Sequence, residues 1–246
     1  MGWPHLYWLL AAAALSFLAY ASYLDVRYRE VEPAYWYAAL RILAPLGALM
    51  VYESLRAPIP HRVVVAQLAA DAAAVAAALA TYLAGLLGGG DLLAVALIAA
   101  ATPLGDSSLL PPALLALLYG SLASLAHVIR FCLVNVARHR ARLAELARRR
   151  GLWRALAACF TSTPMRVGEA LARGWLYPAS WEVGPYRLVE EDPPALLAQV
   201  ASERGYDAWV WVTPGLPEVL YIALGYLAAL LVGDQPIRIL MAPHAG

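Results

Sequence analysis

Six apolar stretches, the first five separated by short polar segments and the last by a longer insert, constrain the fold of this chain more than any other feature. About 20 apolar residues in a helix are enough to cross a hydrocarbon core of roughly 30 Å. The chain is 62% hydrophobic and 14% charged, which is more apolar than a water-soluble domain of this size needs. We therefore predict an all-α polytopic membrane protein with six transmembrane helices, over residues 4–24, 34–52, 63–86, 91–102, 110–136 and 216–232.

Residues 138–213 differ in composition from the apolar stretches on either side. Arginines crowd the beginning of this segment, and its later part holds aromatic and β-branched runs at Trp181–Val189 and Asp207–Thr213 that are typical of strands. Asp192, two prolines and Gly205 bracket a helix over about 193–204. We expect a small α+β insert between the fifth and sixth helices, and hence three regions: 1–137, 138–213 and 214–246.

The distribution of arginine predicts the orientation of the chain. No basic residue precedes the first apolar stretch, so we expect a retained helix with its N-terminus outside and no cleaved signal peptide. The loops 25–33 and 87–91 and the insert then face the cytosol and carry most of the arginines, as the positive-inside rule requires. Asp25 and Asp91 come out at this same cytosolic face of a multi-pass protein of the plasma membrane.

Gly88-Gly89-Gly90-Asp91 places a carboxylate at the start of an apolar stretch. Three glycines permit a sharp turn or a close approach of another backbone. One interpretation is a tight loop whose aspartate caps a helix. The other is that Asp91 forms a catalytic pair with Asp25. Two carboxylates that share a site hold one proton between them, so that one takes a proton from water while the other donates to a carbonyl oxygen.

Three motifs support the catalytic interpretation by resemblance. Tyr23-Leu24-Asp25-Val26-Arg27-Tyr28-Arg29, the GGGD segment and Val212-Thr213-Pro214-Gly215-Leu216-Pro217 resemble segments of the archaeal preflagellin and type IV prepilin peptidases, which are G-x-G-D membrane aspartic peptidases. Glu32-Pro33-Ala34 departs from the Pro-Asn that many relatives have at this point. The resemblance implies that Asp25 and Asp91 are catalytic and that Gly88, Gly89 and Gly90 form the active-site loop.

The same resemblance implies the substrate. Such enzymes remove the short basic leader from archaellin and type IV pilin-like precursors at the cytosolic membrane face. The leader's positive charge has five candidate acidic partners, although solvated surface acids are the alternative interpretation: Glu30, Glu32, Glu190, Glu191 and Asp192. The expected partners are therefore these precursors and membrane lipids. We expect no nucleic acid partner, no cofactor and no metal.

The two cysteines, Cys132 and Cys159, have no spacing typical of metal ligands. We therefore expect neither a zinc site nor a disulfide. The bacterial relatives that also methylate their products have a cysteine-rich cytoplasmic segment. That segment is lacking in this sequence, which predicts no methyltransferase activity.

Asp71 lies near the middle of the third apolar stretch, where a carboxylate is a candidate functional group. Its depth, roughly 22–24 Å from the expected site along the helix, favours a structural polar contact over catalysis. One rival function is a transporter or proton-coupled carrier that relays protons through Asp25, Asp71 and Asp91. Such a carrier usually contains inverted repeats, and we find no repeat in this sequence. A second is a non-catalytic membrane scaffold that acts through the insert.

Overall fold

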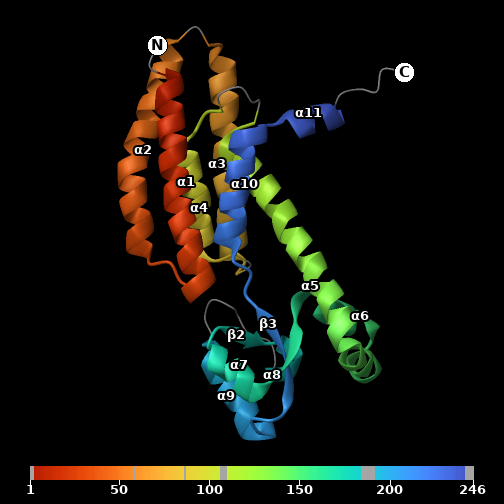
Figure 1. The fold of residues 1–246 in the computed structure, drawn as a ribbon. Helices are drawn as coiled ribbons and strands as arrows, with labels where there is room; N and C mark the ends of the chain where they lie inside the picture. Colours follow the sequence, from red (N-terminus) through yellow and green to blue (C-terminus); the bar gives the residue numbers. More distant parts are fainter. Residues whose placement is uncertain (1–2, 58, 86, 106–109, 184–191, 242–246) are drawn as a thin grey trace, which may run out of the picture. The chain divides into compact units, whose positions relative to one another are not determined.

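The computed structural model describes residues 3–57, 59–85, 87–105, 110–183 and 192–241. Figure 1 shows long helices in the N-terminal half and a small sheet with short helices in the later part of the chain. The helices are α1 Trp3–Tyr28, α2 Pro33–Arg56, α3 His61–Leu83, α4 Gly89–Ala101, α5 Pro112–Arg150, α6 Leu152–Thr161, α7 Val167–Arg173, α8 Ser180–Val183, α9 Pro193–Arg204, α10 Glu218–Val232 and α11 Gln235–Met241. The strands are β1 Thr163–Arg166, β2 Leu176–Pro178 and β3 Trp209–Pro214.

The chain divides into two compact units. Met1–Ala123 and Pro217–Gly246 form the first, which we call the membrane unit, and Ser124–Leu216 form the second, which we call the insert unit. Helix α5 begins in the membrane unit and ends in the insert unit. Each unit has a buried apolar cluster of its own.

Each of the six predicted apolar stretches forms a helix, but the helices differ in length. Helices α1, α2, α3 and α5 are long and apolar enough to cross a membrane, while α4 and α10 are shorter apolar helices. The structure thus supports a polytopic, mainly helical membrane protein with a small sheet. That six helices cross the membrane stays a prediction.

Helix α4 packs against α1, α2, α3 and α10 in the membrane unit (Figure 1). Its buried side chains are small or aliphatic, which lets neighbouring backbones approach closely. A Cβ atom on Gly47 of α2 would lie 1.9 Å from the carbonyl oxygen of Ala100 in α4. One on Gly225 of α10 would lie 2.1 Å from the carbonyl oxygen of Ala116 in α5. Glycine is therefore required at both helix contacts.

Helix α5 continues to Arg150, well beyond the predicted end near residue 136. The polar part is built of Ala, Leu and Arg, which are strong helix formers, and Glu145 pairs with Arg149 one turn later at 2.8 Å. His139 has non-helical φ and ψ angles of −125° and 23°, which mark a kink. The change from apolar to basic composition thus falls inside one kinked helix.

The insert unit contains a three-stranded antiparallel sheet in the order β1-β3-β2. Strand β3 and helix α9 confirm two predictions, whereas the described part of the expected strand Trp181–Val189 forms helix α8 through Val183. Residues 184–191 lie outside the described residues. Strands β1 and β2 were not predicted because each is short and contains a proline. Proline is tolerated on edge strands such as these two.

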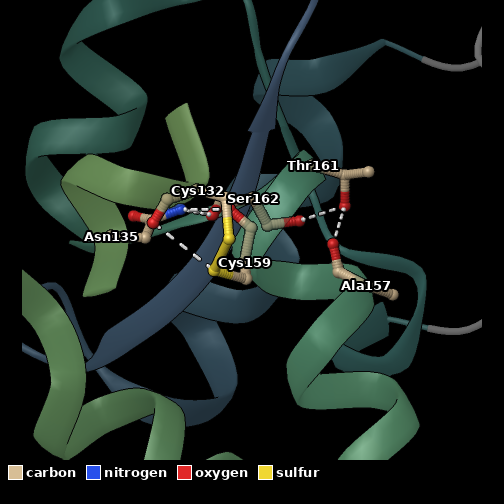
Figure 2. The surroundings of a disulfide bond; sticks show 6 residues. All are labelled: Cys132, Asn135, Ala157, Cys159, Thr161 and Ser162. Carbon is tan, nitrogen blue, oxygen red and sulfur yellow. Dashed lines mark hydrogen bonds between the residues drawn. A yellow bond between two sulfur atoms is a disulfide. The ribbon is translucent and has the colours of Figure 1, made fainter. Parts of the chain in front are cut away.

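A disulfide joins Cys132 of α5 to Cys159 of α6, so the expectation of no disulfide was wrong (Figure 2). Beside it the Asn135 amide donates to the carbonyl oxygens of Cys159, at 2.9 Å, and Ser162, at 2.8 Å. The Ser162 hydroxyl in turn lies 2.9 Å from the hydroxyl of Thr213 in β3. One covalent bond and a short polar chain therefore fix α5, α6 and the sheet to one another.

Candidate active site

Asp25 lies in the last turns of α1, because the helix continues to Tyr28 rather than ending near residue 24. Arg29 closes the helix in the left-handed region, with φ 58°, and its backbone N–H donates to the Asp25 carbonyl oxygen at 3.0 Å. Its guanidinium group also acts electrostatically on the Asp25 carboxylate, as does the backbone amide of Val219. One carboxylate oxygen, Oδ2, is buried and has no hydrogen-bond partner among the described residues.

Asp91 lies in the first turn of α4, where its Oδ2 accepts a hydrogen bond of 2.9 Å from the Gly88 backbone N–H. The helix-capping interpretation of this aspartate is therefore correct as far as local geometry goes. A Cβ atom on Gly88 would lie 2.9 Å from that same Oδ2, so a larger residue would crowd the carboxylate. The positive φ angle of this region belongs to Gly85, at 72°, and not to the GGGD glycines. Close approach, rather than a sharp turn, explains Gly88.

The structure brings Asp25 and Asp91 into electrostatic contact. They lie 66 positions apart, on α1 and α4, and these helices pack against each other. Glu218, in the first turn of α10, also acts on the charge of Asp91. Asp91 is thus within electrostatic range of two acidic side chains, one from α1 and one from α10. An acidic group of this kind can bind and move protons.

Gly90 adjoins a buried polar group that the sequence analysis missed. A Cβ atom on Gly90 would lie 3.8 Å from Nε1 of Trp36, in α2, and 3.9 Å from Cγ2 of Val219. The Trp36 side chain is fully buried, and its indole N–H has no hydrogen-bond partner among the described residues. A buried, unpartnered donor therefore lies beside the Asp91 loop. No sequence signal distinguishes Trp36, because a tryptophan at a helix start is ordinary in a membrane protein.

The acidic residues proposed to receive a basic leader are not equally placed. Glu30 and Glu32 are exposed in the segment between α1 and α2, in the same unit as the aspartate pair. Asp192 is exposed at the start of α9, in the insert unit. Glu190 and Glu191 lie outside the described residues. The sequence analysis did not single out Glu218, although this residue directly follows the segment Val212–Pro217 that resembles the family.

Asp71 is buried in α3, with 5% of its surface exposed. Neither of its carboxylate oxygens has a hydrogen-bond partner of good geometry among the described residues, but the backbone N–H of Ala113 is near enough to act as a weak donor, which agrees with the predicted structural polar contact. The backbone amide of Ala113 and the Tyr226 hydroxyl do act on it electrostatically. Among the described residues, no hydrogen bond joins Asp71 to either aspartate of the pair.

Within the described residues, no group of three or more His, Cys, Asp or Glu side chains is arranged to hold a metal ion. Water activated between two carboxylates would need only the side chains already named.

Comparison with known proteins gives one family. Residues 12–129 match the type IV leader peptidase family. The match contains Asp25, the GGGD segment and Trp36, and it ends within α5, before the insert unit's sheet. A search of curated proteins found no match to the chain.

Proposed function

The chain belongs to the type IV leader peptidase family, and from that premise we propose that it is an aspartic endopeptidase that removes the basic leader from archaellin or pilin-like precursors. The observation that carries the proposal is that α1 packs against α4 and brings Asp25 within electrostatic range of Asp91. A peptidase of the aspartic type needs two carboxylates near one water molecule. This family match makes the protein a leader-peptidase-like membrane protease, and the aspartate pair supplies the chemistry.

Each residue of the proposed site has a distinct role. One carboxylate of the pair takes a proton from water as the oxygen attacks the scissile carbonyl carbon, and the other, protonated, donates to the carbonyl oxygen. The resulting tetrahedral diol collapses when the nitrogen of the leaving peptide takes up a proton. The Gly88 N–H holds Asp91 in position through its Oδ2. The unpartnered Trp36 N–H donates to the peptide or to the diol oxygen.

The acidic surroundings support a basic leader as the substrate. Glu218 acts on the Asp91 charge, and Glu30 and Glu32 are exposed in the segment just after α1. We propose that these groups attract the leader's basic residues, at the cytosolic face that the arginine distribution predicts. The hydrophobic helix of the precursor would then lie in the bilayer beside the membrane unit.

Co-expression with a pilin-like precursor tests this function. Wild-type protein should shorten the precursor by its leader, while Asp25→Asn and Asp91→Asn should each lower processing by about a thousandfold, within the range seen for general acid–base groups. Asp71→Asn is the matched control, since it neutralises a buried aspartate of the same unit outside the pair. Processing that persists in both Asp25→Ala and Asp91→Ala would falsify the proposal.

The control also tests the carrier hypothesis. A relay through Asp71 would make Asp71→Asn inactive in proton uptake by vesicles, with precursor processing unaffected. A peptidase predicts no proton uptake by the wild type at all. The observation that favours this second function is the buried Asp71 carboxylate, whose oxygens lack a well-formed hydrogen bond among the described residues.

A further inference from the structure

A cavity lined by basic and aromatic side chains lies in the insert unit. All of its lining residues lie outside residues 12–129, which match the family. Its volume is about 420 Å³, which is within the range of small-molecule sites. The wall combines the polar end of α5 with β1, α8, the end of α9 and β3. We call it the arginine cavity, after four residues of its wall: Arg142, Arg149, Arg150 and Arg204.

The charged side chains of the wall do not neutralise one another, and the excess positive charge favours an anion. Two glutamates also line the cavity, and both are occupied: Glu145 pairs with Arg149 at 2.8 Å, and Glu182 pairs with Arg204. Arg150 has no ion pair among the described residues. Four guanidinium groups against two carboxylates leave a net positive charge, which a ligand can neutralise.

The wall of the arginine cavity offers a ligand hydrogen-bond donors. The Trp181 indole N–H is buried and has no partner among the described residues. The Arg142 guanidinium lies 4.3 Å from the centre of the Trp209 ring, an arrangement that holds its plane in place. A ligand that accepts several hydrogen bonds and carries negative charge fits this wall. Phosphate groups have this chemistry and are favoured by arginine.

The sequence of α5 indicates where that phosphate comes from. About 20 residues of helix suffice to cross a bilayer, and the apolar part of α5, residues 112–137, is long enough. Six arginines then follow between Arg138 and Arg150, which is typical of a segment beside an anionic membrane surface. Arg142 is four residues, roughly 6 Å along a helix, from the start of this basic part. We propose that the arginine cavity binds the phosphate headgroup of an anionic phospholipid.

The test uses the full-length protein in detergent, titrated with phosphatidylglycerol or phosphatidylcholine and examined by native mass spectrometry. The wild type should retain phosphatidylglycerol at least about tenfold more tightly than phosphatidylcholine. The double variant Arg149→Gln/Arg150→Gln should lose most of this preference. The matched control, Arg138→Gln/Arg148→Gln, removes the same charge from the same helix without touching the cavity wall, and should keep the preference.

A third variant tests the donor. Trp181→Phe keeps an aromatic ring but removes the N–H, and should weaken phosphatidylglycerol binding about threefold to tenfold. Because all these arginines are at the protein surface, thermal unfolding of each variant should stay near that of the wild type.

Three results would overturn the proposal. Equal losses in the two double variants would mean general attraction to a basic helix rather than a site. No preference between the two lipids would exclude an anionic headgroup. Binding of inorganic phosphate at low millimolar concentration, without any lipid preference, would assign the cavity to a soluble phosphate compound instead. Precursor processing is measured separately, so failure here leaves the peptidase proposal untouched.

Discussion

The two units treat their buried polar groups differently. In the membrane unit, Asp25 Oδ2, the Trp36 indole N–H and both oxygens of Asp71 are buried without hydrogen-bond partners among the described residues. In the insert unit the Trp181 indole N–H is also unpartnered, but Asn135 makes two hydrogen bonds and Glu182 pairs with Arg204. An unpartnered polar group costs most in an apolar environment. The unpartnered groups, most of them in the membrane unit, therefore point to function, while the partnered ones in the insert unit point to stability.

The units also differ in how their helices are joined. Glycines such as Gly47 and Gly225 bring backbones into direct contact in the membrane unit. A disulfide and the Asn135 hydrogen bonds join α5 to α6 in the insert unit. In lipid the hydrophobic effect does not favour association between helices, so van der Waals contacts from close packing must stabilise it. A small unit in water instead gains from a covalent link.

Removal of the disulfide should have the largest effect on stability. Cys132→Ser/Cys159→Ser opens a loop with a sequence separation of 27 residues, which should cost the insert unit about 3–4 kcal/mol. Limited proteolysis should cut the insert unit of the variant at lower temperature, with the membrane unit still resistant. Reduced wild-type protein is the control and should behave like the variant. Wild-type thiols that react with maleimide before reduction would contradict the bond.

Gly225→Ala should have a comparable effect in the membrane unit. The added Cβ would lie 2.1 Å from the Ala116 carbonyl oxygen, so α10 has to move away from α5. We expect a loss of about 3 kcal/mol, the upper part of the range for overpacking. Thermal unfolding in detergent measures it. Gly215→Ala is the control, since nothing lies within 4 Å of the added atom; equal destabilisation by both would refute the close-contact explanation.

Trp36→Phe and Trp181→Phe compare an unpartnered indole N–H in each unit. Trp36→Phe should lower the rate of precursor processing about tenfold, and it should also destabilise the membrane unit by about 1–2 kcal/mol because the smaller ring leaves a cavity at a fully buried position. Trp181→Phe should leave processing unchanged. The pair of variants is measured with one precursor under single-turnover conditions. If both variants slow processing equally, the special role of Trp36 is wrong.

Asp207→Ala should have the smallest effect. Its ion pair with Arg166, at 2.9 Å, is on the surface, where Asp207 is 96% exposed. We expect a change of about 0.5 kcal/mol or less in the free energy of unfolding. Glu182→Gln, whose side chain is only 12% exposed beside Arg204, should cost about 1–3 kcal/mol. Equal values for these two variants would show that burial does not govern the ion pairs of the insert unit.

Much of the candidate site could be proposed from the sequence because its signals are local. Apolar length predicts the helices, and an even number of expected crossings places Asp25 and Asp91 at one face. The motif around Asp91 and the motif around Asp25 suggest the family, which the match over residues 12–129 confirms. The disulfide was not predictable, since 27 residues separate the cysteines and one of them lies in an apolar helix.

By itself, the sequence determined which segments are apolar helices, where the basic residues gather, and which two aspartates are candidates for catalysis. Only the tertiary structure decided what surrounds them: Trp36 beside Gly90, Glu218 beside Asp91, and four arginines around one cavity of the insert unit. Periodicity and composition act over a few helical turns, whereas these contacts join residues far apart in the chain. Their partners depend on how whole helices pack.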